Sequence, residues 1–352
     1  MSEQKFVNLS NETQASTVQG TSFTAYPTQP VLYANEVLDA AKKRFFFTNF
    51  INIVYLPTGH KDYVVRKRTI YLRSDITFDT GEATTSDISN TSLSTLDGET
   101  LTPTVVTARF TVTNYAVRTN AFNVVKEAKA ELSEGIGDRI DAAVSTAMGD
   151  ATASADTTQG ALALYGGTAT ADSGLAAGDV ITTDLIAEAA RYLKDSIMYY
   201  RSGGVITEAT NKKNPWTNTP DDPFVLFIGP AQEMTLRKDS QFVNAEQYGG
   251  NEVVQNGEIG RYLGIKVVVA DNVERVAASG TAPDGGSAPT VNMTRCILAK
   301  AKKACTLCWG QEPTIDVAPI QWRKQQSIVL ECAYAIKVIH DDAIIFIDVA
   351  DE

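Results

Sequence analysis

The chain has 352 residues, of which 43% are hydrophobic and 21% are charged. This composition is typical of a folded globular protein and excludes general disorder. The net charge of −11 excludes a nucleic-acid binder that relies on a broad basic surface. No apolar run reaches the ~20 residues that span a bilayer, so we expect no membrane partner.

The N-terminal segment divides into an arm and a helix. Met1 to about Pro30 is rich in Ser, Thr, Gln and Asn without a helical or strand period, which indicates an extended arm. From Leu32 to about Phe47 the sequence predicts a helix, with Lys42, Lys43 and Arg44 favourably placed near its C-terminal end.

The next stretch reads as a long two-stranded ribbon. Tyr63–Arg73 forms the outgoing strand and Thr104–Arg118 the returning one, in which apolar and polar residues alternate. Between Ser74 and Ala108 there is no Lys or Arg, whereas acidic residues recur. The predicted ribbon therefore has a basic root and an acidic end.

A ribbon of this kind is marginal in water on its own, because it buries little apolar area. Either the rest of the chain covers it or another copy does. A second interpretation is two ordinary strands of a larger sheet with a disordered insert. The charge polarity favours exchange between copies. The candidate assembly residues are Arg66, Lys67, Arg68, Ile70, Leu72, Arg73, Asp79, Glu82, Asp87, Asp97, Arg109, Phe110 and Val112.

The middle of the chain predicts a long helix and a small α/β region. Apolar residues at intervals of three and four predict a helix over Asn120–Gly149. An Ala/Thr/Gly-rich linker precedes a helix at about Thr183–Arg201, which Gly203 and Gly204 would end. The remaining predictions here are buried strands at Phe224–Ile228 and Ile265–Ala270 and a short helix at Ala231–Arg237.

The last quarter is rich in predicted strands. After a flexible loop at Ala277–Thr290, we expect strands at Thr294–Ala299, Ala304–Trp309, Ser327–Ile339 and Ala343–Val349. An α+β protein is therefore predicted, in which the ribbon, the long helix and the closing strands flank a small α/β region.

Chemistry-bearing motifs are scarce. Cys305 and Cys308 have CxxC spacing, but the two histidines, His60 and His340, do not complete a zinc pattern. We expect all four cysteines to be buried reduced thiols, as in a reducing cytosol. No phosphate-binding loop or nucleophile elbow occurs, and His340-Asp341-Asp342 reads as a polar turn. We expect no catalytic, cofactor-binding or metal site.

Three runs of the sequence resemble a known family. These are Phe224-Val225-Leu226-Phe227-Ile228-Gly229-Pro230, Leu236-Arg237-Lys238-Asp239, and Asn256-Gly257-Glu258-Ile259-Gly260-Arg261-Tyr262-Leu263-Gly264-Ile265-Lys266-Val267-Val268 after Tyr248-Gly249-Gly250. They resemble major capsid proteins of tailed double-stranded-DNA phages and their archaeal relatives, which have the Hong Kong ninety-seven fold. The order of predicted elements agrees with that family over nearly the whole chain.

The resemblance implies a division of the chain into the parts of that fold. These are an N-terminal arm (1–30), a peripheral-domain entry helix (31–59), the E-loop hairpin (60–118), the spine helix (119–150), a linker (151–179), the axial (A) domain (180–278), a surface loop (279–292) and the closing strands of the peripheral (P) domain (293–352).

The resemblance implies a structural protein that self-assembles as hexamers and pentamers into an icosahedral virion shell around DNA, made and assembled in the host cytoplasm. Its partners would be other copies, scaffolding, portal and decoration proteins, and weakly held DNA. Two alternatives remain: an encapsulin-like nanocompartment subunit, and a cytosolic hydrolase with an inserted ribbon.

Overall fold

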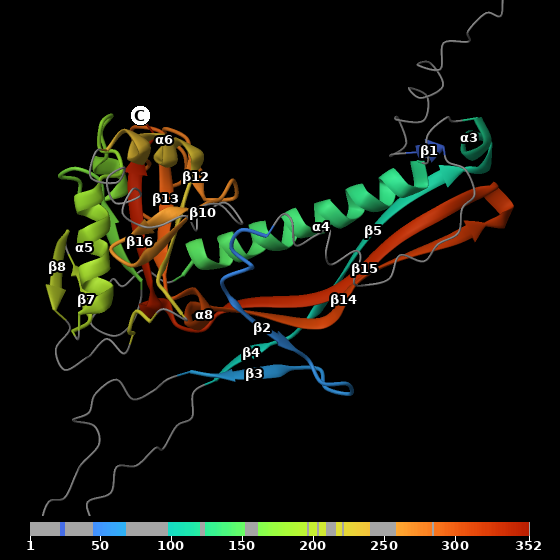
Figure 1. The fold of residues 1–352 in the computed structure, drawn as a ribbon, viewed down its shortest axis with the longest axis horizontal. Coiled ribbons are helices and arrows are strands. Elements are labelled where there is room, and N and C mark those ends of the chain that lie inside the picture. Colours follow the sequence, from blue (N-terminus) through green and yellow to red (C-terminus); the bar gives the residue numbers. More distant parts are fainter. Residues whose placement is uncertain are drawn as a thin grey trace, which may run out of the picture. The chain divides into compact units, whose positions relative to one another are not determined.

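The computed structural model describes residues 22–24, 45–67, 98–119, 124–151, 161–195, 197–202, 204–208, 216–219, 222–239, 258–283 and 285–351 (Figure 1). These residues form a mixed fold of helices and strands, which confirms the predicted α+β class. In this part of the chain, no helix is long and apolar enough to cross a membrane.

The helices are α3 (Asn114–Thr119), α4 (Val124–Gly149), α5 (Thr183–Lys194), α6 (Pro230–Lys238) and α8 (Ala301–Ala304), with short 3-10 turns η2 (Asp172–Gly174), η3 (Gln321–Arg323) and η4 (Asp341–Ala343). The strands are β1 (Ser22–Thr24), β2 (Asn52–Tyr55), β3 (Tyr63–Arg66), β4 (Gly98–Leu101), β5 (Thr104–Thr113), β6 (Leu162–Tyr165), β7 (Tyr199–Ser202), β8 (Val205–Glu208), β9 (Val225–Ile228), β10 (Glu258–Tyr262), β11 (Ile265–Val269), β12 (Arg275–Val276), β13 (Met293–Ala299), β14 (Cys305–Ile320), β15 (Gln325–Val338) and β16 (Ile344–Ala350).

The chain divides into two compact units. Unit 1 comprises residues 1–45, 103–139 and 309–334, and unit 2 comprises 46–102, 140–308 and 335–352. Both units are discontinuous in sequence, because the chain enters and leaves each of them more than once.

Unit 1 contains an elongated sheet in which β5, β15 and β14 are neighbours and β1 pairs in parallel with β5. Strand β5 is antiparallel to β15, with a continuous register from Thr104↔Tyr334 to Thr113↔Gln325. Within this unit β14 is an edge strand, which suits its prolines because proline cannot donate to a further strand.

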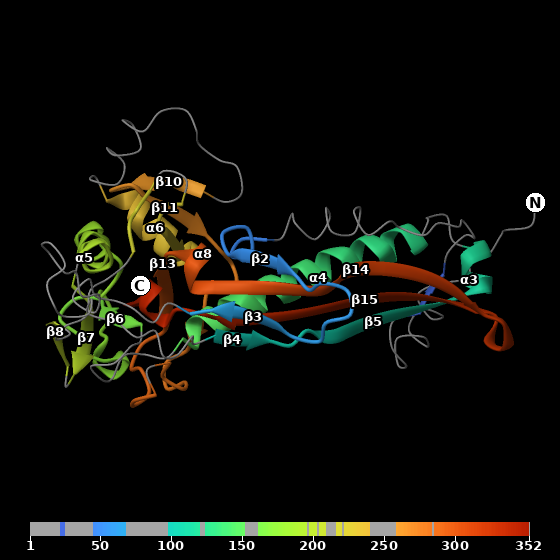
Figure 2. The same cartoon turned by 90° about the horizontal axis from the view of Figure 1, so that it is seen from below.

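The first half of α4 covers this sheet (Figure 2). Val125, Ala128, Leu132 and Ile136 recur at helical spacing and are all buried. The opposite side chains of this segment are charged and exposed. The segment is therefore an amphipathic helix whose apolar stripe forms a core with the sheet.

Unit 2 contains a seven-stranded sheet in the order β10-β11-β9-β13-β16-β6, with β12 paired to β13. Strands β6, β9, β13 and β16 are buried at every position, as the continuous apolar run at Phe224–Ile228 predicts for β9. Strands from the ranges 180–278 and 293–352 therefore lie in the same sheet.

The ribbon predicted from sequence has a different partner. The outgoing strand β3 pairs with β4, and β5 pairs with β15. Pro103 separates β4 from β5 and removes a backbone donor at that point. Strand β5 joins the larger sheet beside β15, and the apolar side chains of the two strands lie on the same face of that sheet. This face buries more apolar area than a two-stranded ribbon can.

Several predicted element bounds are also wrong. The returning strand stops at Thr113, where β15 begins opposite it, and Asn114–Thr119 forms helix α3. The helix predicted to reach Arg201 ends at Lys194, and Tyr199–Ser202 instead pairs with β8. Gly204, with a φ of 82°, lies between these strands rather than at a helix end.

Other predicted elements are confirmed within the described residues. Helix α4, helix α6, strands β9, β11, β13 and β16 and the polar turn η4 lie where the patterns indicate. Strand β14 is much longer than the predicted Ala304–Trp309. The arm, apart from Ser22–Thr24, and residues 32–44 of the predicted Leu32–Phe47 helix lie outside the described residues, and Phe45 to Phe47 are not helical.

A buried carboxylate fixes α4 to the segment that precedes β2. Asp141 Oδ1 accepts hydrogen bonds from the backbone N–H groups of Phe46 (3.0 Å), Phe47 (2.8 Å) and Thr48 (3.0 Å), and from the Thr48 hydroxyl (3.1 Å). The Asn272 amide donates to Oδ2 at 3.4 Å. Burial raises the pKa of Asp141, and these hydrogen bonds oppose that rise.

A second buried charge lies within the seven-stranded sheet. Arg295 on β13 donates to both carboxylate oxygens of Asp348, its cross-strand partner on β16, at 2.9 and 2.7 Å. Its guanidinium also lies 4.4 Å from the ring centroid of Phe346. Burial disfavours the charge, but the bidentate contact with Asp348 outweighs it and raises the pKa of Arg295.

We expect Asp141→Ala to lower the free energy of unfolding by about 3 kcal/mol or more, because it leaves several buried donors without an acceptor. Denaturant unfolding of the unassembled full chain measures this loss. The control Glu131→Gln changes an exposed acid on the same helix and should stay within about 0.5 kcal/mol of the parent. Equal effects of the two substitutions would show that the carboxylate does not hold the two segments together.

Candidate assembly surfaces

The root of the ribbon packs on its own chain through one face. Strands β3 and β4 are antiparallel, with Tyr63 opposite Leu101 and Val65 opposite Glu99. Tyr63, Val65 and Leu101 pack in a cluster with Cys308 and Ile339. In the described part of the ribbon, one face therefore belongs to the core of unit 2.

The other face of the ribbon root points away from that cluster. Val64 is 58% exposed, and Arg66 and Thr100 are also exposed. The alternation is that of a half-buried strand pair, with one apolar face inward. An exposed valine and an arginine are thus held on a rigid support, where another surface can contact them.

Charged residues surround the base of the ribbon. Glu99 on β4 forms a 2.6 Å ion pair with Lys337 on β15. Burial raises the pKa of Asp341 in η4, the charge of Lys67 lowers it and the charge of Glu99 raises it. These groups connect the ribbon base electrostatically to the turn between β15 and β16.

The structure separates the candidate assembly residues into two groups. Arg66 and Lys67 lie at the ribbon, whereas Arg109, Phe110 and Val112 lie on β5, in unit 1. The other eight, Arg68, Ile70, Leu72, Arg73, Asp79, Glu82, Asp87 and Asp97, lie outside the described residues.

The β5 residues do not act together as one surface. Val112 is fully buried and Phe110 is half-buried opposite Ile328, so both pack within their own chain. Assigning Val112 to an interface was therefore wrong, because its side chain belongs to the core. Arg109 is exposed on the other face of the strand.

Sequence reasoning missed an aromatic and cationic group at the turn between β14 and β15. Trp322 in η3 is 78% exposed, and the guanidinium of Arg323 lies 4.2 Å from its ring centroid. Tyr115 on α3 is 70% exposed, and the N–H of Asn114 donates to the carbonyl of Lys324 at 2.9 Å. A tryptophan between two predicted strands was the available signal.

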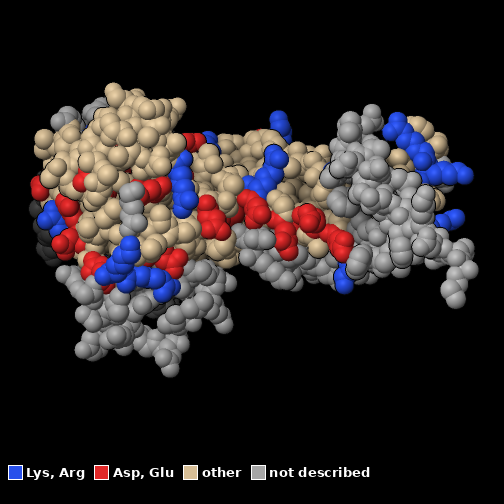
Figure 3. All heavy atoms as spheres, turned by 90° about the horizontal axis from the view of Figure 1, so that it is seen from above, with Lys and Arg blue, Asp and Glu red and all other residues tan. Residues whose placement is uncertain are grey.

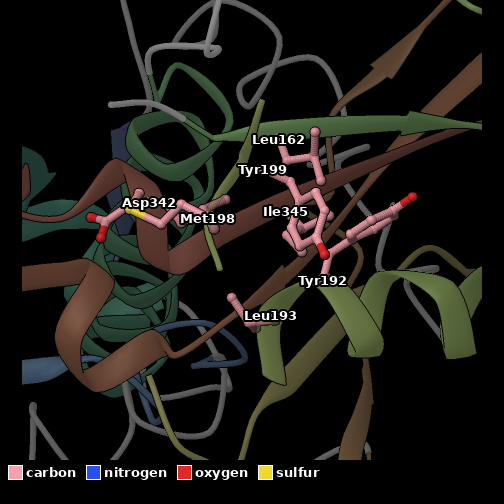
Figure 4. Close-up of a pocket in the computed structure, with 8 residues that line it drawn as sticks. Leu162, Tyr192, Leu193, Met198, Tyr199, Asp342 and Ile345 are labelled. Atoms are coloured by element: carbon pink, nitrogen blue, oxygen red, sulfur yellow. The ribbon is translucent and has the colours of Figure 1, made fainter. Parts of the chain in front are cut away.

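A small pocket in unit 2 lies between α5, β6 and β16 (Figure 4). It is lined mostly by apolar side chains together with Tyr192, Tyr199 and Asp342. The Tyr199 hydroxyl donates to Asp195 at 2.8 Å, which raises the pKa of Tyr199 to about 12. Burial raises the pKa of Asp342 to about 6.

The pocket lacks the parts of a hydrolytic site. Its lining contains no serine, cysteine or histidine, and the Tyr192 hydroxyl already donates to Glu188 at 3.0 Å. Elsewhere in the described ranges, no group of three or more His, Cys, Asp or Glu side chains is arranged to hold a metal ion.

All four cysteines are buried and free, as predicted. Burial raises the pKa of each thiol, to about 12 for Cys305 and about 11 for Cys332. A thiol that is both inaccessible and protonated reacts slowly.

We therefore expect a thiol reagent to label the folded protein negligibly and to label all four cysteines after unfolding. Val64→Cys, at an exposed position, should add one rapidly reacting thiol and serves as the positive control. Rapid labelling of the parent chain would contradict the burial of these residues.

We expect Leu101→Ala to lower the free energy of unfolding by about 2–5 kcal/mol, because Leu101 is 1% exposed and fills the cluster beneath the ribbon. Val64→Ala, on the opposite face of the same ribbon, should cost no more than about 0.5 kcal/mol. Denaturant unfolding measures both. Similar losses from both variants would mean that the ribbon root is not anchored by one face.

Comparison with known proteins gives a family match and several fold matches. A family model described as phage capsid protein matches residues 98–344. No curated protein matches the chain. Among solved structures, the capsid of Ralstonia phage GP4 has a TM-score of 0.60 at 12% identity, covering 95% of this chain and 96% of that one.

Two further solved structures extend this likeness. The cyanophage Pam1 capsid has a TM-score of 0.58 at 12% identity, covering 100% of this chain and 99% of that one. The head of Helicobacter pylori bacteriophage KHP40 has a TM-score of 0.56 at 10% identity, covering 99% and 98%. At these identities the likeness is one of fold.

Proposed function

The chain belongs to the phage capsid protein family, and on that premise we propose that it forms the icosahedral shell of a tailed virus as hexamers and pentamers around double-stranded DNA. The family match over residues 98–344 is the observation that carries the proposal. The protein has a structural role, in the virion capsid, and we propose that it has no catalytic activity.

The proposal includes a division of the chain by role. We assign residues 1–30 to an arm, 31–59 to the entry into the peripheral domain, 60–118 to the E-loop and 119–150 to the spine helix. We assign residues 151–179 to the linker, which also contributes the buried strand β6 to the sheet of unit 2, 180–278 to the axial domain, 279–292 to a surface loop and 293–352 to the closing strands, of which β13 and β16 share that sheet. The likeness in fold to phage capsids over nearly the whole chain supports this division.

We propose that the ribbon of each copy lies across a neighbouring copy, with its acidic end against a basic surface. The basic root residues Arg66 and Lys67 and the acidic residues Asp79, Glu82, Asp87 and Asp97 supply the charge polarity. Exposed ion pairs contribute only about 0–1 kcal/mol each. The strength of a shell therefore comes from many repeated contacts and from apolar burial.

The acidic balance of the chain suits a wall that holds DNA weakly, because the genome must leave later. We propose that scaffolding, portal and decoration proteins are further partners, and that assembly takes place in the host cytoplasm.

The first test is the size of the full chain expressed alone and with a co-expressed scaffolding protein. We expect closed particles in negative-stain microscopy and a matching hydrodynamic radius in light scattering. A monomer or small oligomer under both conditions would contradict the proposed shell. Particles isolated from infected host cells should contain double-stranded DNA, and protein cargo in its place would indicate a nanocompartment.

We expect deletion of residues 79–97 to leave a folded protein that assembles poorly, because it removes the acidic end of the ribbon. A sharper variant combines Asp79→Asn, Glu82→Gln, Asp87→Asn and Asp97→Asn, which removes charge and keeps length. Circular dichroism checks folding and sedimentation measures assembly. The control Glu208→Gln with Asp271→Asn, at two exposed acids elsewhere, should assemble as the parent does; normal shells from both ribbon variants would refute the mechanism.

A further inference from the structure

The turn between β14 and β15 presents an unusual surface. Trp322 is the most exposed large apolar side chain among the described residues, at 78%. It lies in the 3-10 turn η3, between two long strands that pair with each other. An exposed tryptophan leaves a large apolar area in water, and contact with another surface would bury that area.

The turn makes contacts with α3 and within itself. Lys324 adopts a left-handed backbone with a φ of 50°, and its carbonyl accepts from Asn114 at the start of α3. Arg323 stacks on the indole of Trp322 at 4.2 Å. Such fixed aromatic and arginine side chains are the residue types that dominate binding energy at protein interfaces.

Positive charge gathers around this tryptophan. Arg323 and Lys324 follow it directly in the chain, and Arg118 is exposed on α3, which also carries the 70% exposed Tyr115. Within the described part of the chain these three cations form no ion pair. Figure 3 shows Lys and Arg side chains gathered at this end of unit 1. We call Tyr115, Arg118, Trp322, Arg323 and Lys324 the aromatic–cationic tip.

The complementary charge lies on the same unit, along α4. Glu127, Glu131, Glu134 and Asp138 are all exposed. Their spacing of four, three and four residues places them on one helical face. Figure 3 shows a row of acidic side chains over this helix. We call these four residues the acidic stripe.

We propose that the aromatic–cationic tip docks on the acidic stripe of a second copy of this chain. A second copy suits this tip because every copy carries both surfaces, and a head-to-tail contact between different patches repeats from subunit to subunit. Opposite charge fixes the orientation, and burial of Trp322 supplies the apolar contact. This inference rests on the proposed shell function and names residues of a contact distinct from the ribbon.

Charge reversal tests the contact in the full-length chain under the conditions in which the parent forms particles. We expect Trp322→Ala and Arg323→Glu each to raise the protein concentration needed for assembly by at least about tenfold, equivalent to about 1.4 kcal/mol. Both side chains are exposed and contact each other rather than the core. Their substitution should therefore leave the melting temperature of the unassembled chain unchanged. Sedimentation measures the assembled fraction.

Rescue distinguishes this contact from a general effect of charge. Glu131→Lys should impair assembly alone and restore it when combined with Arg323→Glu in the same chain. The control Lys303→Glu reverses an exposed cation on α8 and should assemble as the parent does.

The outcomes separate this inference from the proposed function. Parental assembly by Trp322→Ala and Arg323→Glu, with shells formed by the parent, would overturn the docking contact and leave the shell function standing. Loss of assembly without rescue by Glu131→Lys would assign the tip to a different surface and overturn the pairing with the acidic stripe. A parent chain that forms no particles under any condition would overturn both proposals.

Discussion

The pairing of β5 with β15 constrains most of the structure. It runs without interruption over ten residue pairs, from Thr104↔Tyr334 to Thr113↔Gln325. A shift of one residue in this pairing would turn the apolar side chains of one strand to the opposite face of the sheet, so the buried face fixes the register. Because β5 is committed to this sheet, β3 pairs with the shorter β4, and the ribbon begins from a separate root.

In this arrangement the buried apolar side chains are divided between two cores, one in each unit, and some side chains outside the cores remain exposed. The seven-stranded sheet of unit 2 buries whole strands and even accommodates the Arg295–Asp348 pair. The sheet of unit 1 is covered by α4 on one face, while Val105 on β5 remains 63% exposed. Such a division suits a subunit that must contact many neighbours, because some apolar side chains stay exposed after folding and can be buried in contacts between copies.

The sequence predicted the elements with strong periodicity or continuous apolar character. Apolar residues at intervals of three and four, such as Val125, Leu132 and Ile136, indicated α4, and the run at Phe224–Ile228 indicated a fully buried strand. Strand partners were not predictable in the same way. Alternation along Thr104–Thr113 shows that one face is buried, but it does not say which strand lies alongside.

The candidate site was predicted less well than the fold. Local charge patterning proposed Arg66 and Lys67, which lie at the ribbon and stay a prediction. Val112 looked like an interface residue because its burial depends on β15, which is distant in sequence. Trp322 was not among the candidate residues, because the sequence alone does not show that the turn exposes it. Whether a side chain is buried or exposed depends on which segments of the chain pack together. Contacts between segments that are distant in sequence are the hardest feature to read from local patterns.

The distance in sequence between β5 and β15 has a consequence for synthesis. Strand β5 leaves the ribosome roughly 200 residues before its partner exists, a delay of about 10–40 s at ordinary elongation rates. During that interval unit 1 has no complete sheet, and the β14–β15 turn has not yet been made. A nascent chain therefore lacks the surfaces of a finished subunit until its C-terminal quarter emerges, so translation itself sets the earliest moment at which neighbouring copies can recognise one another.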